Sequence, residues 1–179
     1  MRILLISGKA EHGKTSAANI LKNVLEENGK SALILNFASY LKYICEKYFN
    51  WNGKKDSYGR ALLQSIGTDV VRASEPDFWV RSLWDLIRVF FKNTDYIIVD
   101  DVRFPNEILF FREMNIPHFS IRINRLDFTS SLTDSQKKHF SETALDCFGF
   151  DFSFNVKNNL KSLESTMIKF YKQVLKNTP

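Results

Sequence analysis

The chain alternates short apolar runs with longer amphipathic stretches, which is typical of a protein built from strands and helices. Five apolar runs without helical spacing each predict a strand, at 4–6, 32–37, 96–101, 118–123 and 152–156. Apolar residues at helical spacing separate these runs, and a closing helix is expected over 160–174. Strands that alternate with helices predict an α/β fold, in which a five-stranded parallel sheet lies between two layers of helices.

The stretch between the second and third strands, residues 38–91, has helical spacing almost throughout. We expect one helix at its start, a second that begins at Ser57 and ends at Gly67, a further helical piece over 68–73, and another helix over 78–91. A polar turn over 51–56 separates the first two helices. Because a crossover between parallel strands needs only about a dozen residues, this stretch is predicted to be a helical insertion.

Three further stretches complete the outline. A helix is expected over 104–114 and a short one over 142–148. Residues 125–142 are rich in Thr, Ser, Asp, Gln and Lys and carry few apolar anchors. We therefore expect a mobile, partly helical flap there, acting as a small lid.

Composition narrows the class of protein. The 179 residues suit a single domain over 1–179, and the 44% that are apolar are enough for a sizeable core. A net charge of +5 suits phosphorylated ligands or nucleic acid. No stretch has the length of a transmembrane helix, and no secretory signal or membrane partner is expected. Cys45 and Cys147 lack a metal-ligand spacing, so we expect free thiols and a cytoplasmic protein.

The first apolar run leads into a glycine-rich loop. Residues 8–15 read Gly-Lys-Ala-Glu-His-Gly-Lys-Thr, which is the G-x-x-x-x-G-K-T pattern of a P-loop, and a predicted helix follows, as the motif requires. The glycines let successive backbone N–H groups turn toward phosphate oxygens, and the lysine adds a charge that follows the β and γ phosphates. The residues expected to hold ATP are Gly8, Lys9, Ala10, His12, Gly13, Lys14, Thr15 and Ser16.

Acidic residues end the third apolar run. Thr15 offers a hydroxyl to Mg²⁺, and a P-loop enzyme places an acidic residue from a neighbouring strand on the same ion. Asp100 and Asp101 both end this run, and strand spacing points to either of them. The sequence therefore predicts a magnesium site formed by Thr15 with Asp100 or Asp101.

Arginines stand at positions that suit phosphate binding. Their planar fork can bind two oxygens at once. Arg60 and Arg72 lie on the insertion, Arg103 follows the third strand, and Arg122 and Arg125 flank the flap. Position favours a phosphate-binding role for Arg60, Arg72, Arg103 and Arg125. Together with the P-loop they predict a P-loop NTPase fold of three αβα layers that carries out phosphoryl transfer.

Several short blocks in combination resemble one family. The chain reads Leu-Leu-Gln-Ser-Ile-Gly-Thr-Asp at 62–69, Pro-Asp-Phe-Trp at 76–79, Asp-Val-Arg-Phe-Pro-Asn-Glu at 101–107 and His-Phe-Ser-Glu at 139–142, with Arg72 between the first two blocks. This combination resembles the deoxynucleoside monophosphate kinases of bacteriophages, within the nucleoside monophosphate kinase-like P-loop folds. The P-loop is generic, whereas the other blocks are more specific when they occur together.

The resemblance implies transfer of the ATP γ-phosphoryl group to a deoxynucleoside 5′-monophosphate, with Mg²⁺ as cofactor. It implies that the insertion binds the acceptor and that the catalytic residues are Lys14, Asp101, Arg103 and Arg125. The residues that it implies for substrate binding are Ser39, Lys42, Arg60, Gln64, Asp69, Arg72, Trp79, Arg103, Glu107 and Glu142. It does not fix the accepted base, and a homodimer is a possible assembly.

Other functions share these motifs. A kinase that phosphorylates a hydroxyl of a nucleic acid or a modified base would use the same donor chemistry and would bind DNA in a salt-dependent way. Nucleic acid is an expected partner only in that case. A kinase of another small molecule shares the fold. A GTP switch would need a guanine-specifying Asn-Lys-x-Asp segment, which the sequence lacks.

Overall fold

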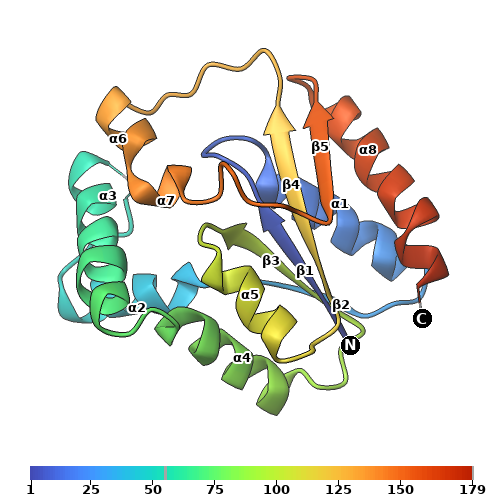
Figure 1. The fold of residues 1–179 in the computed structure, drawn as a ribbon, viewed down its shortest axis with the longest axis horizontal. Coiled ribbons are helices and arrows are strands. Elements are labelled where there is room, and N and C mark those ends of the chain that lie inside the picture. Colours follow the sequence, from blue (N-terminus) through green and yellow to red (C-terminus); the bar gives the residue numbers. More distant parts are fainter. Residues whose placement is uncertain (55, 179) are drawn as a thin grey trace. The chain divides into compact units, whose positions relative to one another are not determined.

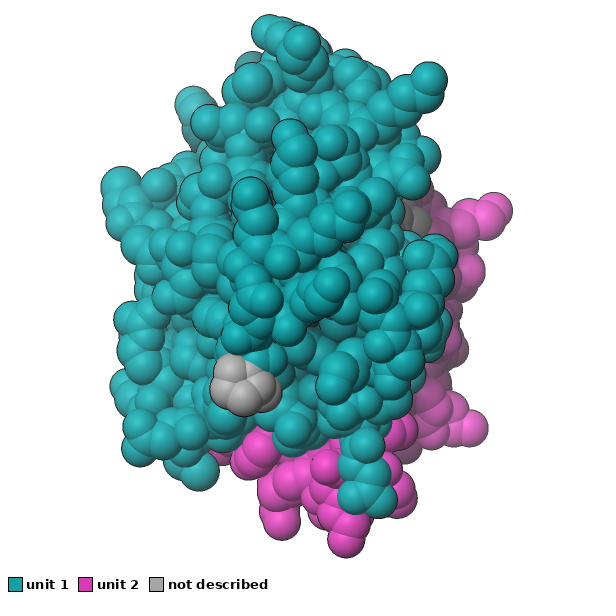
Figure 2. Space-filling model, turned by 90° about the vertical axis from the view of Figure 1, so that its right-hand side faces the viewer, with its two compact units in different colours: residues 1–35, 93–179 teal, residues 36–92 magenta. Residues whose placement is uncertain are grey.

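The computed structural model describes residues 1–54 and 56–178 (Figure 1). Lys55, which falls in the turn expected over 51–56, and Pro179 lie outside the described residues. The chain divides into two compact units, residues 1–35 with 93–179 and residues 36–92, which Figure 2 shows in different colours. The second unit covers the stretch in which a helical insertion was expected.

The first unit is built on a five-stranded parallel sheet, as the sequence predicts. Its strands are β1 (Arg2–Ser7), β2 (Ala32–Leu35), β3 (Tyr96–Val102), β4 (His118–Arg125) and β5 (Phe152–Val156), in the order β2-β3-β1-β4-β5. The central strand β1 pairs with β3 and β4, and its residues from Ile3 to Ser7 are buried. A strand that is covered on both faces is apolar at every position rather than at alternate ones, which explains its run of Ile and Leu.

Helices cover both faces of this sheet (Figure 1). α1 (Lys14–Glu27) and α8 (Leu160–Gln173) pack together on one face, where they bury Leu4 and Ile6 of β1. α5 (Asn106–Glu113) lies on the other face. Side chains alternate along a strand, so Ile3 and Leu5, which are also fully buried, belong to that face. A short 3-10 helix (Leu175–Asn177) follows α8.

The flap contains two short helices, α6 (Asp134–Lys138) and α7 (Phe140–Thr143). The prediction of a short helix over 142–148 is wrong, because that segment begins earlier and is helical for one turn only. The His139 ring nitrogen Nδ1 accepts the N–H of Ser141 and so fixes the start of α7 at Phe140. Residues 144–147 continue as turns, with Leu145 buried.

The second unit consists of helices: α2 (Ala38–Tyr48), α3 (Ser57–Gln64), a π-helix (Ser65–Arg72) and α4 (Phe78–Phe90). The prediction that Gly67 ends a helix is wrong, since the π-helix runs through it. A Cβ at Gly67 would approach Leu41 Cδ2 to 2.6 Å, and the Gly67 carbonyl accepts the indole N–H of Trp79 at 3.0 Å. The glycine therefore permits close packing rather than termination.

Both cysteines are free thiols, as predicted, Cys45 being buried and Cys147 exposed. In the part of the chain that the structure describes, no helix has the length and apolar character needed to cross a membrane.

Candidate active site

Three strand ends of the first unit carry the candidate chemistry. β1 leads into the P-loop, Asp100 and Asp101 lie in the last part of β3, and Arg125 ends β4. Because β1 lies between β3 and β4 in a parallel sheet, their carboxyl ends meet at one edge. The strand order reverses direction at β1, and open α/β sheets bind their ligands at this kind of switch point.

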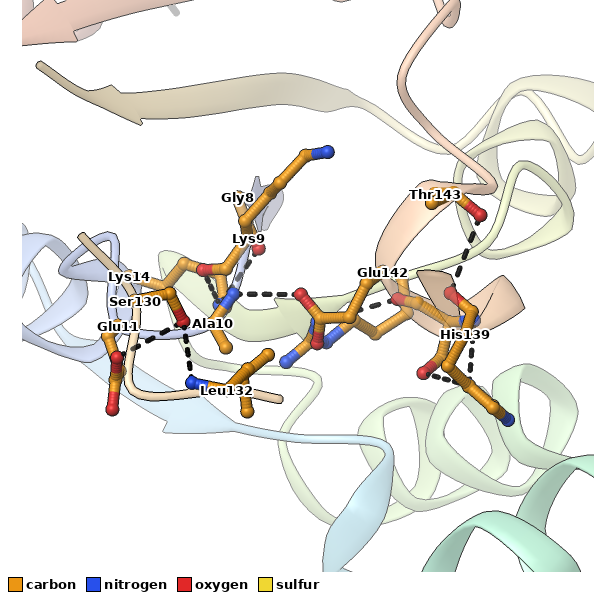
Figure 3. Close-up of polar contacts among 12 residues, drawn as sticks. Gly8, Lys9, Ala10, Glu11, Lys14, Ser130, Leu132, His139, Glu142 and Thr143 are labelled. Atoms are coloured by element: carbon orange, nitrogen blue, oxygen red, sulfur yellow. Dashed lines mark hydrogen bonds and ion pairs between the residues drawn. The ribbon is translucent and has the colours of Figure 1, made fainter. Parts of the chain in front are cut away.

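The P-loop is tightly folded around its lysine. Gly13 precedes α1 with φ +89°, a left-handed conformation that glycine adopts without strain. A Cβ at Gly8 would lie 2.7 Å from the Ile123 carbonyl oxygen of β4, so a side chain is excluded there. Lys14 Nζ donates to the carbonyl oxygens of Gly8 and Lys9, at 2.9 Å in each case (Figure 3). The ammonium group therefore lies against the loop.

The charge of Lys14 is weakened by its surroundings. Its pKa is lowered from 10.5 to about 7, chiefly because burial disfavours the ammonium form and secondly because the Arg103 guanidinium is near. Carboxylates, including those of Glu142 and Asp101, oppose this shift. An anion that binds beside Lys14 would therefore favour its protonation.

Thr15 and the end of β3 bring hard oxygen ligands together. Thr15 Oγ1 donates to Asp100 Oδ2 at 2.6 Å, and Asp100 is buried. Asp101 is half-buried and lies near enough to Lys14 to raise its pKa. Among the described residues no three His, Cys, Asp or Glu side chains form a metal-binding group. One hydroxyl and one carboxylate fit Mg²⁺, which prefers oxygen and commonly takes its other ligands from water and phosphate.

Arg103 is held by two glutamates. Glu107 on α5 is 1% exposed, and its Oε2 accepts the backbone N–H groups of Arg103 at 2.6 Å and Phe104 at 3.0 Å. The Arg103 side chain forms an ion pair with Glu142 and donates to the Ser141 carbonyl oxygen at 3.4 Å. Glu107 therefore positions the loop that carries Arg103, while Glu142 holds the guanidinium.

Glu142 of α7 also contacts the P-loop. Its Oε2 accepts the backbone N–H of Ala10 at 2.9 Å (Figure 3). One carboxylate therefore links the loop amide to Arg103. His139 lies at the start of α7, where its Nδ1 is 2.8 Å from the Ser141 hydroxyl oxygen.

Sequence reasoning gave no role to Arg122, which the structure places beside this loop. Arg122 Nη1 donates to Ser7 Oγ at 3.0 Å, and Nη2 pairs with Asp146 Oδ1 at 3.3 Å. The other oxygen of Asp146 pairs with Lys9 Nζ at 2.8 Å. A charged residue within an apolar strand was the available signal, since Arg122 lies between buried Ile121 and Ile123.

Arg125 contacts the P-loop from the end of β4. Its Nη1 donates to the Glu11 carbonyl oxygen at 2.9 Å, and its guanidinium lies 4.3 Å from the ring centroid of Phe128. The Arg125 N–H donates to His12 Nδ1 at 3.2 Å, and burial is the main reason that the pKa of His12 is lowered. The Glu11 carboxylate accepts from Ser130 and Ser131, so it also fastens the flap to the P-loop.

The other expected substrate-binding residues belong to the second unit. Trp79 is 3% exposed and its N–H is bonded within that unit, so it packs rather than presents a donor. Asp69 is exposed, and Arg72 ends the π-helix. The expected residues of this unit are Ser39, Lys42, Arg60, Gln64, Asp69, Arg72 and Trp79, and their roles in binding stay predictions.

Comparisons with known proteins agree with the geometry of the first unit. A family model described as deoxynucleotide monophosphate kinase matches residues 14–167. No curated protein sequence matches the chain.

Solved structures support the fold. Shikimate kinase from Bacteroides thetaiotaomicron has a TM-score of 0.57 at 14% identity, with 98% of each chain covered. Shikimate kinase from Aquifex aeolicus has a TM-score of 0.54 at 13% identity, covering 99% of this chain and 100% of that one. APS kinase from Mycobacterium tuberculosis in complex with AMPPNP and APS has a TM-score of 0.52 at 13% identity, covering 96% and 98%. These likenesses show a P-loop kinase fold.

Proposed function

This chain belongs to the deoxynucleotide monophosphate kinase family, and we propose that it transfers the γ-phosphoryl group of ATP to a deoxynucleoside 5′-monophosphate. The products are ADP and the deoxynucleoside diphosphate. The observation that carries the proposal is the meeting of Lys14, the Thr15–Asp100 pair and Arg103 at one edge of the sheet. These are the groups that a phosphoryl-transfer enzyme needs around a nucleoside triphosphate.

The donor phosphates would bind the backbone N–H groups of the P-loop and the ammonium of Lys14. Lys14 Nζ would exchange the carbonyl oxygens of Gly8 and Lys9 for phosphate oxygens, which are stronger acceptors because they are charged. Arg103 would neutralise charge that spreads over the transferred group. Phosphoryl transfer depends on positioning and charge neutralisation, so no dedicated base is needed.

Thr15 and Asp100 would hold Mg²⁺, because their oxygens lie 2.6 Å apart and are of the kind this ion prefers. Bound there, the ion would neutralise charge on the β and γ phosphates. Asp101, which opposes the lowering of the Lys14 pKa as Glu142 and Asp100 also do, would help to keep that lysine charged, while Asp100 bonds to Thr15. These positions give the two neighbouring carboxylates different roles.

The acceptor would bind residues of the unit formed by 36–92. The family match covers this whole unit, which supports the assignment. Arg60 and Arg72 would bind the acceptor phosphate, while Gln64 and Asp69 would border the base and sugar. Trp79 would support that surface through its bond to Gly67 rather than contact the ligand.

A coupled ADP-release assay tests the reaction. ATP, Mg²⁺ and the full chain are mixed in turn with each deoxynucleoside monophosphate, each ribonucleoside monophosphate, shikimate and single-stranded DNA. We expect acceleration with at least one deoxynucleoside monophosphate. Acceleration by DNA alone, falling steeply with added salt, would favour the nucleic-acid kinase instead. If no deoxynucleoside monophosphate accelerates ADP release, the proposal is wrong.

Arg72→Ala tests where the acceptor binds. We expect the KM for the monophosphate to rise about tenfold or more, with the KM for ATP unchanged, because a charge-assisted hydrogen bond to phosphate contributes about 1.5–3 kcal/mol. Arg88→Ala is the matched control, since Arg88 is an exposed arginine of the same unit that pairs with Asp85 at 2.7 Å. Equal losses for ATP and acceptor would contradict the assignment of Arg72.

A further inference from the structure

Two carboxylates from one short segment, residues 142–146, occupy cationic and N–H groups of the candidate site. Glu142 binds the Ala10 N–H and the Arg103 guanidinium. Asp146, four residues further on, binds Lys9 and Arg122. Glu142 and both arginines line one small hollow, together with Gly8 and Ser141.

The partners of these carboxylates are of the kind that bind phosphate. Backbone N–H groups of a P-loop and arginine forks both select anions that present two oxygens. A carboxylate has the same sign of charge and a similar pair of oxygens. Glu142 uses both oxygens: Oε2 accepts the Ala10 N–H, and Oε1 accepts from Arg103. The protein without ligand thus satisfies its anion-binding groups from its own chain.

Arg122 is an unusual group to find in a strand interior. It is 9% exposed, and burial lowers the pKa of its guanidinium. Its ion pair with Asp146 spans 3.3 Å, and the Asp146 side chain is 38% exposed. Arg122 is paired with Ser7 and Asp146, but a buried ion pair often stabilises a fold no more than apolar residues of similar volume would, so packing alone gives little reason for an arginine here. The hollow beside Arg122 and Arg103 is too small for a water molecule while Glu142 lines it, so a ligand could reach these arginines only when Glu142 moves away.

We propose that Glu142 and Asp146 stand in for ligand phosphates, and that Arg122 is a second phosphate-binding arginine beside Arg103. An arriving phosphate displaces Glu142 from Ala10 and Arg103, and draws Arg122 and Lys9 away from Asp146. The inference rests on the proposed function insofar as the ligand is a phosphorylated nucleotide. It replaces the direct substrate contact predicted for Glu142, because a carboxylate in contact with a phosphate would repel it.

Calorimetric titration of inorganic tripolyphosphate into the full chain, at fixed ionic strength and without acceptor, tests the displacement. Glu142→Gln keeps the shape of the side chain but removes the charge that competes with the ligand. We expect this variant to bind tripolyphosphate about tenfold more tightly than wild type, because the contacts of Glu142 with Ala10 and Arg103, which compete with the ligand, are weakened. Asp146→Asn is expected to tighten binding about twofold, since its more exposed pairs contribute less.

Glu164→Gln is the matched control. It removes one negative charge from an exposed position of α8 in the same unit and should leave the affinity within about twofold of wild type. If Glu142→Gln and Asp146→Asn bind tripolyphosphate no more tightly than Glu164→Gln does, the carboxylates do not compete and the proposal is wrong.

Arg122 is tested by comparing Asp146→Asn with the double variant Arg122→Met/Asp146→Asn. The double variant removes the buried charge and its partner together, which protects the fold, and thermal unfolding checks that it is folded. We expect it to bind tripolyphosphate about tenfold more weakly than Asp146→Asn does. Equal affinity would overturn the role of Arg122. None of these titrations contains an acceptor, so they are unaffected if the proposed acceptor proves wrong.

Discussion

The two units hold their candidate residues by different means. In the unit formed by 1–35 and 93–179 the polar side chains are bonded to one another, as Thr15 is to Asp100. In the unit formed by 36–92 the organising contacts are apolar and aromatic. Its Phe78 and Trp79 rings meet edge to face with centroids 4.9 Å apart, and Gly67 packs against Leu41.

In the first unit the polar groups are therefore already arranged before a ligand binds. The second unit contributes mainly a packed surface of defined shape. Prearranged dipoles and charges need little reorganisation when charge develops during a reaction, and catalysis depends strongly on them. A helical unit whose polar residues face water, as Asp69 does, contributes through binding. Substitutions in the first unit should therefore change the reaction rate, and those in the second should change stability and acceptor affinity.

The largest effect is expected for Lys14→Met in the first unit. Turnover should fall about 10³-fold, because one preorganised cationic group beside the transferred phosphoryl is lost. ADP release measures the rate, and thermal unfolding should show an intact fold. Lys22→Met, which removes a lysine that pairs with Glu26 on the outside of α1, is the control. If Lys14→Met keeps more than a tenth of the wild-type turnover, the first unit does not control the reaction rate in the way expected here.

An intermediate effect is expected for Gly67→Ala in the second unit. The added Cβ would meet Leu41 Cδ2 at 2.6 Å, and overpacking of this kind lowers the free energy of unfolding by about 1–3 kcal/mol. All three tryptophans lie in 36–92, so their fluorescence during urea unfolding follows this unit. Tripolyphosphate affinity should be unchanged.

Gly149→Ala provides the comparison for that measurement. Gly149 is exposed and a Cβ there would meet nothing within 4 Å. It should change stability by about 0.5 kcal/mol or less, as surface substitutions usually do. If Gly67→Ala costs no more than Gly149→Ala, close packing does not organise the second unit.

The smallest effect is a proton taken up when phosphate binds the first unit. Lys14, with a pKa of about 7, is mostly neutral at pH 8, and a neighbouring phosphate raises that pKa. Binding of tripolyphosphate at pH 8 should therefore take up nearly one proton, and the affinity should fall as the pH rises above 7. Titration in buffers of different ionisation enthalpy measures the uptake. Lys14→Met should abolish it, and uptake that persists in this variant would assign the proton to another group.

The strands and the P-loop could be predicted because their signals are local. An apolar run followed by glycines at fixed spacing specifies a strand and a loop without knowledge of the rest of the chain. The π-helix could not be predicted in this way. Glycine at position 67 indicates a helix end, whereas the packing against Leu41 that makes a helix possible there comes from a residue 26 positions earlier.

The candidate site was predictable in its residue types but not in its pairings. Strand spacing points equally to Asp100 and Asp101 and the family resemblance points to Asp101, whereas the structure shows that Asp100 meets Thr15. The contact between Ala10 and Glu142 joins residues 132 positions apart, so no local pattern announces it. Such pairings follow from the tertiary fold, which brings α7 back to the loop after β1.

The close approach of Gly8 to the Ile123 carbonyl has a consequence for protein engineering. With 2.7 Å between a would-be Cβ and that oxygen, the loop fits only against a strand that passes at this distance. Residues 8–15 therefore cannot be transferred alone into another protein and keep this conformation. A designed protein that carries this loop must also have a neighbouring strand in the register of β4, because the loop packs against the backbone of that strand.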